Sequence, residues 1–317
     1  EKTDRWCLRR SVGFGMNGVF ILDKPETFTS FDAVAVMRHL FGERKIGHTG
    51  TLDPMATGVL PLLLGKGTRA IPFLEERPKT YRAEFLLGKR TDTLDRTGKL
   101  LEEDEKSVPK EALRETMRTF EGEILQVPPM YSAIRKNGVR LYDLARQGVE
   151  VERSARPVTI YRLKLLEYDE KTRSGALELT CSKGTYVRTL IDDLGKKSGC
   201  CGGVMTNLRR LAAAGFSIDM ALPLLEAKAM EKEELLEKVL PIEALFREYP
   251  KVVVSKAQAK RFLNGGWLDP KRFGEQKFPK DAPLRIKSPE GQFLGLGEWQ
   301  EDALRVLKIF MDQEELK

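Results

Sequence analysis

The stretch GHTGTLDP covers residues 47–54 and places one carboxylate, Asp53, in an extended loop of glycine and proline. More than a hundred residues later, CSKGTYVR covers residues 181–188 and offers Tyr186 and Arg188 at a strand-to-helix turn. A carboxylate with a tyrosine and a guanidinium within reach has the parts of a site in which an aspartate attacks a substrate. The alternative for Asp53 is an aspartate that stabilises a turn before proline.

The length and composition predict a globular protein with a full core. The chain has 317 residues, of which 41% are hydrophobic and 32% are charged, and we expect one large domain with a small one. The longest apolar stretch, residues 59–64, contains Pro61 and is too short to span a bilayer. Residues 1–10 lack the apolar core of a signal peptide, so we expect a cytoplasmic protein that does not contact a membrane.

Several common classes of site are disfavoured by the sequence. Its cysteines and histidines are Cys7, Cys181, Cys200, Cys201, His39 and His48. They form no C-x-x-C pair, so a zinc site is improbable and we expect reduced thiols that bind no metal. The glycine pattern at residues 13–18 precedes a predicted strand instead of following one, which disfavours a Rossmann dinucleotide site. Zinc deaminase chemistry is excluded, because H-x-E with P-C-x-x-C is absent from the sequence.

Positive charge is concentrated in one part of the chain. The net charge is +7, and residues 132–164 contain eight Lys or Arg against three acids. Such an excess attracts a polyanion such as RNA, through phosphate contacts that release counterions. A solvated basic face explains this run equally well when it is taken by itself.

Hydrophobic periodicity predicts interspersed strands and helices. The predicted strands are residues 19–22, residues 81–87, and a strand with Leu177, Leu179 and Cys181 on one face. The predicted helices have apolar faces at Ala33, Val36, Met37, Leu40 and Phe41, at Leu113, Met117 and Phe120, and at Val187, Leu190, Ile191 and Leu194. Thr29 or Ser30 is the expected cap of the first helix. Because no regular βαβ repeat is present, we expect an α+β fold with a mixed sheet and helices against it.

The sequence changes character near residues 249–250. A charged helical stretch at residues 226–245 precedes this point. Short β-like runs follow it at residues 252–254, 284–287, 292–296 and 304–311. A capping box at Ser255 and Gln258 opens a short helix among them. This pattern predicts a small closed β domain.

The run from residue 17 to residue 222 resembles the TruB-type tRNA pseudouridine synthases. The resemblance rests on blocks in the same order: LDKP (22–25) with Thr29-Ser30, GHTGTLDPMATG (47–58), KTYR (79–82), GxxTDT (88–93), PPMYSA (128–133), NGxRLY (137–142) and CSKGTYVR (181–188). Thr27 stands where the family pattern has glycine.

This resemblance implies the fold and the domains. We expect the pseudouridine synthase fold, with a mixed, mainly antiparallel sheet and flanking helices, plus a small C-terminal β-barrel of the PUA type. Residues 1–16 would be a leader or a cloning remnant, residues 17–249 the catalytic domain, and residues 250–317 the PUA RNA-binding domain. Residues 128–156 would be a basic insert that clamps RNA and is mobile without it.

The resemblance also implies the reaction and the partner. The expected enzyme isomerises uridine to pseudouridine at position 55 in the T-loop of tRNA, after flipping the base out of its stack. This reaction uses no cofactor and no metal. The expected partner is tRNA, bound at its T-loop and acceptor stem, and we expect the protein to be a monomer. The alternatives are a non-catalytic RNA-binding or tRNA-folding protein and a guide-RNA-dependent synthase for ribosomal RNA.

Four residues have catalytic roles by this resemblance. Asp53 is the nucleophile, which attacks the ribose C1′ or the base C6 or assists an elimination. Arg188 aims Asp53, although a helix ion pair with Asp192 is the alternative for this arginine. Tyr81 stacks on the target base, and Tyr186 helps to remove the C5 proton.

Further residues are implied in RNA binding: Lys24, His48, Leu208, Arg135, Arg140, Arg146, Arg209 and Arg210. Lys24 would support the active-site loop or a nearby phosphate, and His48 would lie near the flipped nucleotide. Leu208 would form an apolar wall of the pocket, with ordinary core packing as its alternative. The arginines would contact the RNA loop and its phosphates.

Overall fold

The computed structural model describes residues 16–132, 134–136, 138–269, 282–300 and 303–316. Its large sheet contains β1 (Gly18–Lys24), β2 (Ile46–His48), β3 (Thr57–Leu64), β4 (Lys79–Leu87), β7 (Gly122–Gln126), β10 (Arg156–Asp169), β11 (Ser174–Cys181), β12 (Gly203–Ala213), β13 (Phe216–Ser217) and β14 (Leu222–Pro223). The strand order is β14-β1-β3-β12-β4-β11-β10-β7, with β2 paired to β3 and β13 to β12. The β1–β14 and β3–β12 pairs are parallel and the other pairs are antiparallel, so the sheet is mixed and mainly antiparallel.

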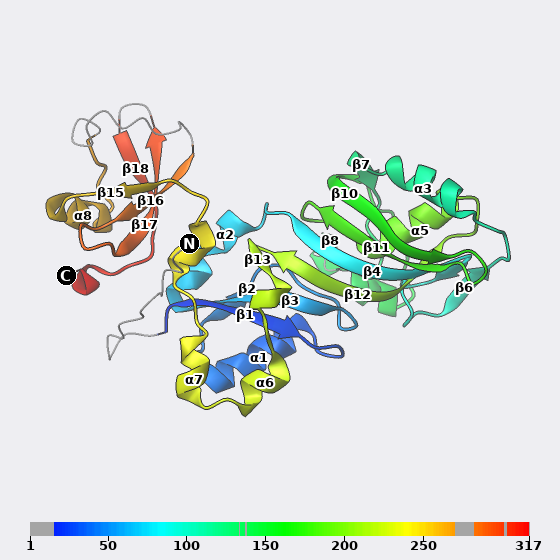
Figure 1. Ribbon diagram of the computed structural model, residues 1–317, viewed down its shortest axis with the longest axis horizontal. Coiled ribbons are helices and arrows are strands. Elements are labelled where there is room, and N and C mark those ends of the chain that lie inside the picture. Colours follow the sequence, from blue (N-terminus) through cyan, green and yellow to red (C-terminus); the bar gives the residue numbers. More distant parts are fainter. Residues whose placement is uncertain (1–15, 133, 137, 270–281, 301–302, 317) are drawn as a thin grey trace.

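Helices cover both ends of this sheet. They are α1 (Ser30–Phe41), α2 (Ile71–Leu74), α3 (Lys110–Arg118), α4 (Leu141–Arg146), α5 (Val187–Lys197), α6 (Leu224–Ala229) and α7 (Lys232–Glu237). Two small hairpins, β5 (Lys89–Thr91) with β6 (Leu100–Glu103) and β8 (Arg135–Lys136) with β9 (Val139–Arg140), lie outside it. Helices α3 and α5 pack on β4, β10 and β11, and α1, α6 and α7 lie beside β1 and β3 (Figure 1). Within the described ranges, none of the helices has the length and apolar character that a membrane crossing needs.

The turn between β1 and α1 is fixed by local chemistry. Thr29 caps α1, because its hydroxyl accepts from the Asp32 amide at 3.0 Å and the Asp32 carboxylate accepts from the Thr29 amide at 2.9 Å. Thr27 has φ of 71°, a left-handed conformation that favours glycine. Its amide donates to the carbonyl of Pro54 at 2.9 Å. The turn therefore holds the loop that carries Asp53.

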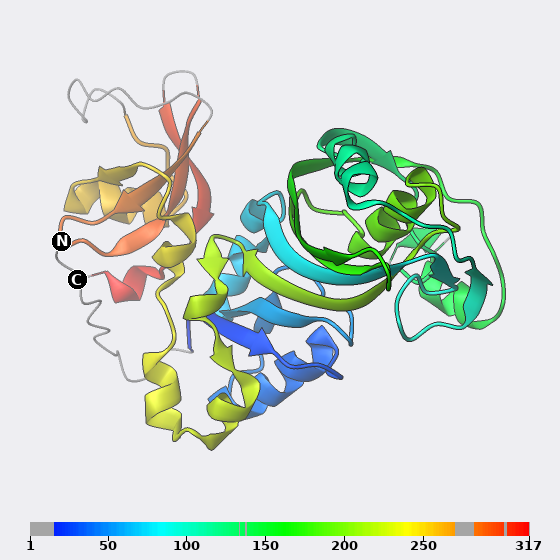
Figure 2. The same ribbon diagram turned by 45° about the vertical axis from the view of Figure 1, so that its right-hand side comes forward.

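Strand β4 alternates as the sequence predicts. Tyr81, Ala83, Phe85 and Leu87 are buried in one cluster with apolar residues of α3 and α5. Strand β4 pairs with β12 on one edge and with β11 on the other (Figure 2). Tyr81 thus lies in the middle of the sheet, flanked by strands from distant parts of the chain.

The charged stretch at residues 226–245 differs from the single helical segment that we expected. Helices α6 and α7 are separated at Met230 and Glu231, and a 3-10 turn covers Ile242–Phe246. Met230, Glu231 and Pro241 have extended backbone angles that interrupt a helix.

The C-terminal region forms a sheet of its own. Its strands are β15 (Lys251–Val253), β16 (Pro283–Lys287), β17 (Phe293–Gln300) and β18 (Ala303–Ile309), paired in that order. Helix α8 (Lys256–Leu263) begins at the predicted capping box of Ser255 and Gln258. Closure into a barrel stays a prediction, because residues 270–281 and 301–302 lie outside the described residues.

An aromatic cluster joins the two sheets. Phe246 is fully buried, and the rings of Phe73, Tyr249, Phe293 and Phe310 have centroids 5.6 to 6.1 Å from its own. Phe293 lies in β17 and Phe310 follows β18, so Phe246 packs against the C-terminal sheet. Nearby, the Glu243 carboxylate accepts from Arg285 and Lys287, each at 3.0 Å. The C-terminal sheet is therefore docked through both apolar and ionic contacts.

We expect Phe246→Ala to lower the free energy of unfolding by about 3 to 5 kcal/mol, because the cavity that it leaves lies between four aromatic rings. Urea titration measures this loss, and limited proteolysis should release the C-terminal region first. Leu225→Ala is the control, since Leu225 is 76% exposed and should cost little. A loss below about 1 kcal/mol for Phe246→Ala would contradict the docking.

Candidate active site

A cavity of about 1120 Å³ opens at the middle of the large sheet. Residues 48–55 form one wall, Tyr81 of β4 lies at the base, and Tyr186 and Arg188 border it at the start of α5. The structure therefore brings the four predicted catalytic residues to one cavity, although they come from three separate segments of the chain.

Asp53 and Arg188 form an ion pair in this cavity. Arg188 Nε lies 3.1 Å from Asp53 Oδ2, with the aspartate side chain 38% exposed and the arginine 7% exposed. The carboxylate is thus open to the cavity while its guanidinium partner is buried behind it. The alternative of an Arg188–Asp192 helix pair is wrong, because Asp192 pairs with Arg90 at 3.4 Å and Lys196 at 2.7 Å.

A second carboxylate, Asp95, lies on the far side of the guanidinium. Asp95 Oδ2 is 3.6 Å from Arg188 Nη1, and Arg188 also donates to the carbonyls of Thr93 and Tyr131, both at 3.0 Å. Hydrogen bonds from Thr97 to Asp95 hold this carboxylate in turn. The sequence reasoning missed Asp95, although it follows the GxxTDT block by two residues.

The two tyrosines lie on rigid elements. Burial raises the pKa of both Tyr81 and Tyr186, so their hydroxyls stay protonated at neutral pH and can donate hydrogen bonds. The amide of Tyr186 donates to Gln126 Oε1 at 2.8 Å, and Gln126 Nε2 donates to the Tyr186 carbonyl at 3.1 Å. Gln126 is buried, and the sequence reasoning missed its role in holding the start of α5.

Lys24 supports the loop instead of meeting a phosphate. Its side chain is fully buried, and Nζ donates to the carbonyls of Phe28 at 2.6 Å, Pro25 at 2.8 Å and Pro54 at 3.4 Å. Burial lowers the pKa of Lys24 to about 8, against the attraction of Asp53. The contacts of Lys24 therefore fit the first of its two predicted roles, which is to support the active-site loop.

Three other residues that were predicted to bind RNA make contacts within the protein, and their contacts with RNA stay predictions. Arg209 pairs with Asp23, with Nη2 2.7 Å from Oδ2. Arg210 is fully buried beneath the loop and so does not face solvent as a surface phosphate contact would. Leu208 packs in the core cluster that also contains Leu52 and Tyr81, which fits its alternative of core packing.

The basic insert, residues 128–156, forms part of the lining of the cavity. Arg135 and Arg146 line it, and the guanidinium of Arg146 lies 5.5 Å from the ring centre of Tyr142. The side chain of Arg140 lies outside what the structure describes. His48 also lines the cavity, and burial and the nearby Arg210 lower its pKa and keep it neutral at pH 7.

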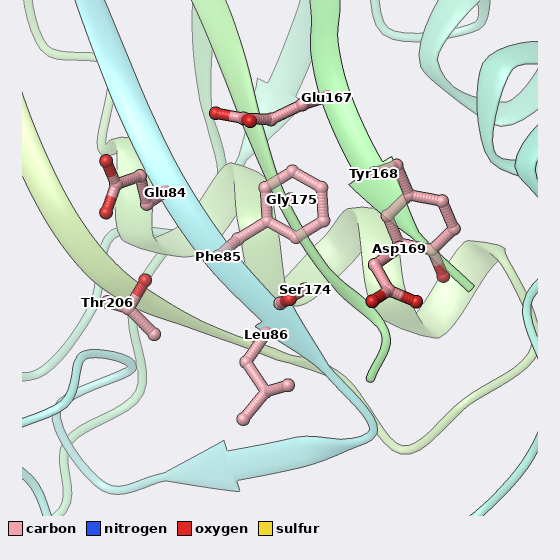
Figure 3. A pocket seen from close by; sticks show the side chains of 9 residues that line it. All are labelled: Glu84, Phe85, Leu86, Glu167, Tyr168, Asp169, Ser174, Gly175 and Thr206. Atoms are coloured by element: carbon pink, nitrogen blue, oxygen red, sulfur yellow. The ribbon is translucent and has the colours of Figure 1, made fainter. Parts of the chain in front are cut away.

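A second hollow, of about 510 Å³, has a different character (Figure 3). It is lined by Glu84, Phe85, Leu86, Glu167, Tyr168, Asp169, Ser174, Gly175 and Thr206. Its three carboxylates would repel a nucleic acid, and none of the predicted catalytic residues borders it. The cavity around Asp53 is therefore the candidate active site.

Comparison with known proteins agrees with this geometry. The profile described as "TruB family pseudouridylate synthase (N terminal domain)" matches residues 38–187. The tRNA pseudouridine synthase B of Clostridium acetobutylicum is 40% identical over 294 residues, which cover 93% of this chain and 99% of that protein. The chain belongs to the TruB family of pseudouridylate synthases.

Two further family profiles match the C-terminal part of this TruB family member. The profiles "tRNA pseudouridylate synthase B C-terminal domain" and "Pseudouridine synthase II TruB, C-terminal" match residues 188–247 and 250–307. The tRNA pseudouridine synthase B of an Azoarcus species is 42% identical over 94% of this chain and 96% of its own length. One chain of a solved Cbf5-Nop10-Gar1 complex is similar in structure, with a TM-score of 0.70 and 26% sequence identity. The alignment covers 94% of this chain and 86% of that chain. The chain is thus a pseudouridine synthase with the fold of that group of enzymes, as the sequence predicts.

Proposed function

We propose that this TruB family enzyme isomerises uridine to pseudouridine at position 55 in the T-loop of tRNA, with Asp53 as the nucleophile. The observation that carries the proposal is the ion pair in which Asp53 faces the cavity and Arg188 is buried behind it. Relatives named tRNA pseudouridine synthase B, about 40% identical over most of the chain, support tRNA as the substrate. The solved Cbf5 complex is less similar, at 26% identity, so a guide-dependent function is less well supported.

The chemistry follows from the groups at the cavity. The N1–C1′ bond of uridine breaks, the base turns over, and a C5–C1′ bond forms, after which C5 loses its proton and N1 gains one. Attack of Asp53 on C1′, its addition to C6, and assisted elimination all need an ionised carboxylate at this position. The guanidinium of Arg188, whose Nε lies 3.1 Å from Asp53 Oδ2, pairs with that carboxylate and fixes its direction.

The tyrosines act on the base. Tyr81, at the base of the cavity, supplies a flat apolar surface against which an extruded uracil stacks. Tyr186 stands beside Arg188 at the start of α5, where its hydroxyl can assist removal of the C5 proton. Tyr81 is held by burial, and the main chain of Tyr186 is held by its two hydrogen bonds with Gln126, so that placing the two residues costs little at the moment of reaction.

RNA contacts must compensate for base extrusion, which costs a few kcal/mol. We assign the clamp to residues 128–156, whose Arg135 and Arg146 line the cavity. Residues 250–317, assigned as the PUA domain, would reach the acceptor stem. One chain supplies all of the cavity residues named here, so a monomer is sufficient for the reaction.

Tritium release tests the proposal. The wild-type protein should release tritium from 5-tritiated uridine in a T-loop transcript, up to one equivalent per chain of RNA, without any guide RNA or added cofactor. Chemical mapping of pseudouridine should then mark position 55 alone. A transcript with cytidine at position 55 is the control and should release none. Modification that appears only with a guide RNA, or at another position, would contradict the proposed function.

A further inference from the structure

Among the residues that the structure describes, Arg210 is a buried cation without a counterion. Its side chain is fully buried, with Nε donating to the Val59 carbonyl at 2.7 Å and Nη2 to the Gly50 carbonyl at 3.2 Å. Nη1 has no hydrogen-bond partner of proper geometry within the described residues, although the Tyr81 hydroxyl is close enough to interact with the guanidinium electrostatically. Burying a charge without an opposite charge costs folding free energy, so a compensating use is expected.

Lys79 converges on the same point. A Cβ atom placed on Gly50 would lie 3.6 Å from Arg210 Nη1 and 4.0 Å from Lys79 Nζ, so both cationic groups flank this glycine. Among the described residues, neither Lys79 nor Arg210 takes part in an ion pair within 4.0 Å, whereas Lys183 in the same cavity is paired with Glu76. Burial and Arg210 lower the pKa of Lys79, and the weaker effects of Cys181, Glu75 and Glu76 oppose them.

His48 completes this cluster of nitrogen groups. Its Nδ1 atom is buried and has no hydrogen-bond partner within the described residues. Like Lys79 and Arg210, it lines the cavity that contains Asp53. The cationic groups of the cavity thus fall into two kinds. Arg188 is paired with two carboxylates, whereas Lys79 and Arg210 have no carboxylate partner within 4.0 Å among the described residues.

A cluster of this kind fits an anion. On an RNA substrate the anion is the phosphodiester, and every extruded nucleotide carries one on each side of its ribose. Lys79 is half-buried and can reach such a group, while Arg210 behind Gly50 adds to the positive potential without needing to touch it. Gly50, with φ of 79° and no side chain, leaves the approach open.

We infer that Lys79, backed by Arg210 and beside His48, forms a phosphate subsite for a phosphodiester that flanks the reacting uridine. This inference rests on the proposed function, because it takes RNA as the substrate. The subsite holds the backbone of the extruded nucleotide, and so sets the position of the ribose relative to Asp53.

A protein–RNA thermodynamic cycle tests the subsite. We expect Lys79→Gln to weaken binding of a T-loop transcript about 10-fold. The RNA is then changed by placing a neutral methylphosphonate at one of the two phosphates that flank the target uridine. At the phosphate that the subsite binds, this change weakens wild-type binding by a similar factor. Lys79→Gln then causes almost no further loss of affinity. The control is Lys183→Gln, which removes an exposed, paired lysine of the same cavity and should lose affinity independently of the methylphosphonate.

The stability of the RNA-free protein gives a second measurement. Lys79→Gln removes a charge that lies near Arg210, so the melting temperature should rise, by about 2 °C. Lys183→Gln loses its contact with Glu76 and should not raise it. Equal effects of Lys79→Gln on natural RNA and on both methylphosphonate RNAs would overturn the subsite. If the wild type modifies position 55 but the effects of Lys79→Gln on the three RNAs are equal, the proposed function stands and the subsite alone is wrong.

Discussion

Asp53→Asn should form no detectable pseudouridine. We expect kcat to fall by at least about 10⁴-fold, because an amide of the same size cannot act as the nucleophile that begins the reaction. Binding of the T-loop RNA should be unchanged or tighter, since the substitution removes a negative charge that is 38% exposed in an RNA cavity. Single-turnover tritium release measures the first effect, and filter binding measures the second.

A remote carboxylate supplies the control for Asp53. Asp169 lies at the end of β10, outside the Asp53 cavity, so Asp169→Asn should release tritium at the wild-type rate. Near-normal turnover by Asp53→Asn would remove this residue from the mechanism, whichever atom of the nucleotide it was thought to attack. Loss of RNA binding together with turnover would instead point to a folding defect, which circular dichroism would detect.

Arg188→Met should reduce both activity and stability. The variant leaves Asp95 buried without its cation and leaves the carbonyls of Thr93 and Tyr131 without a donor. We expect the free energy of unfolding to fall by about 3 to 5 kcal/mol, as for other buried pairs that lose one partner. The rate should fall about 10³-fold, because Asp53 loses the group that aims it. Urea titration and tritium release measure the two effects.

A double variant separates the two roles of Arg188. Arg188→Met with Asp95→Asn replaces the buried carboxylate by a neutral amide, so part of the lost stability should return. Activity should not return, because Asp53 is still without its guanidinium. If the double variant is no more stable than Arg188→Met, then the uncompensated charge of Asp95 is not the cause of the destabilisation.

Local features of this fold could be predicted from the sequence because their causes are local. The cap of α1 depends on Thr29 and Asp32, which lie three residues apart, and the buried face of β4 depends on alternation along one strand. The Asp53–Arg188 pair joins residues far apart in the sequence, and periodicity alone left Arg188 open to a pairing with Asp192. The resemblance to a family selected the correct partner.

The buried cations could not be predicted, because basic side chains are usually exposed and their burial depends on tertiary contacts. Lys24 is buried by carbonyls that include Pro54, which is 30 residues away. Arg210 is buried by the carbonyls of Gly50 and Val59, more than 150 residues away. Residue type favoured phosphate contacts for these side chains, and only the folded chain reveals the backbone oxygens that surround them.

The position of β12 between β3 and β4 has a consequence for synthesis on the ribosome. The chain makes β3 and β4 early, but the strand that joins them begins at Gly203, after 115 further residues. At ordinary rates of translation this interval lasts about 6 to 23 s. During that time the facing edges of β3 and β4 have unpaired backbone groups, which are open to pairing with other chains. A nascent chain stalled within this interval is the form of the protein most exposed to aggregation.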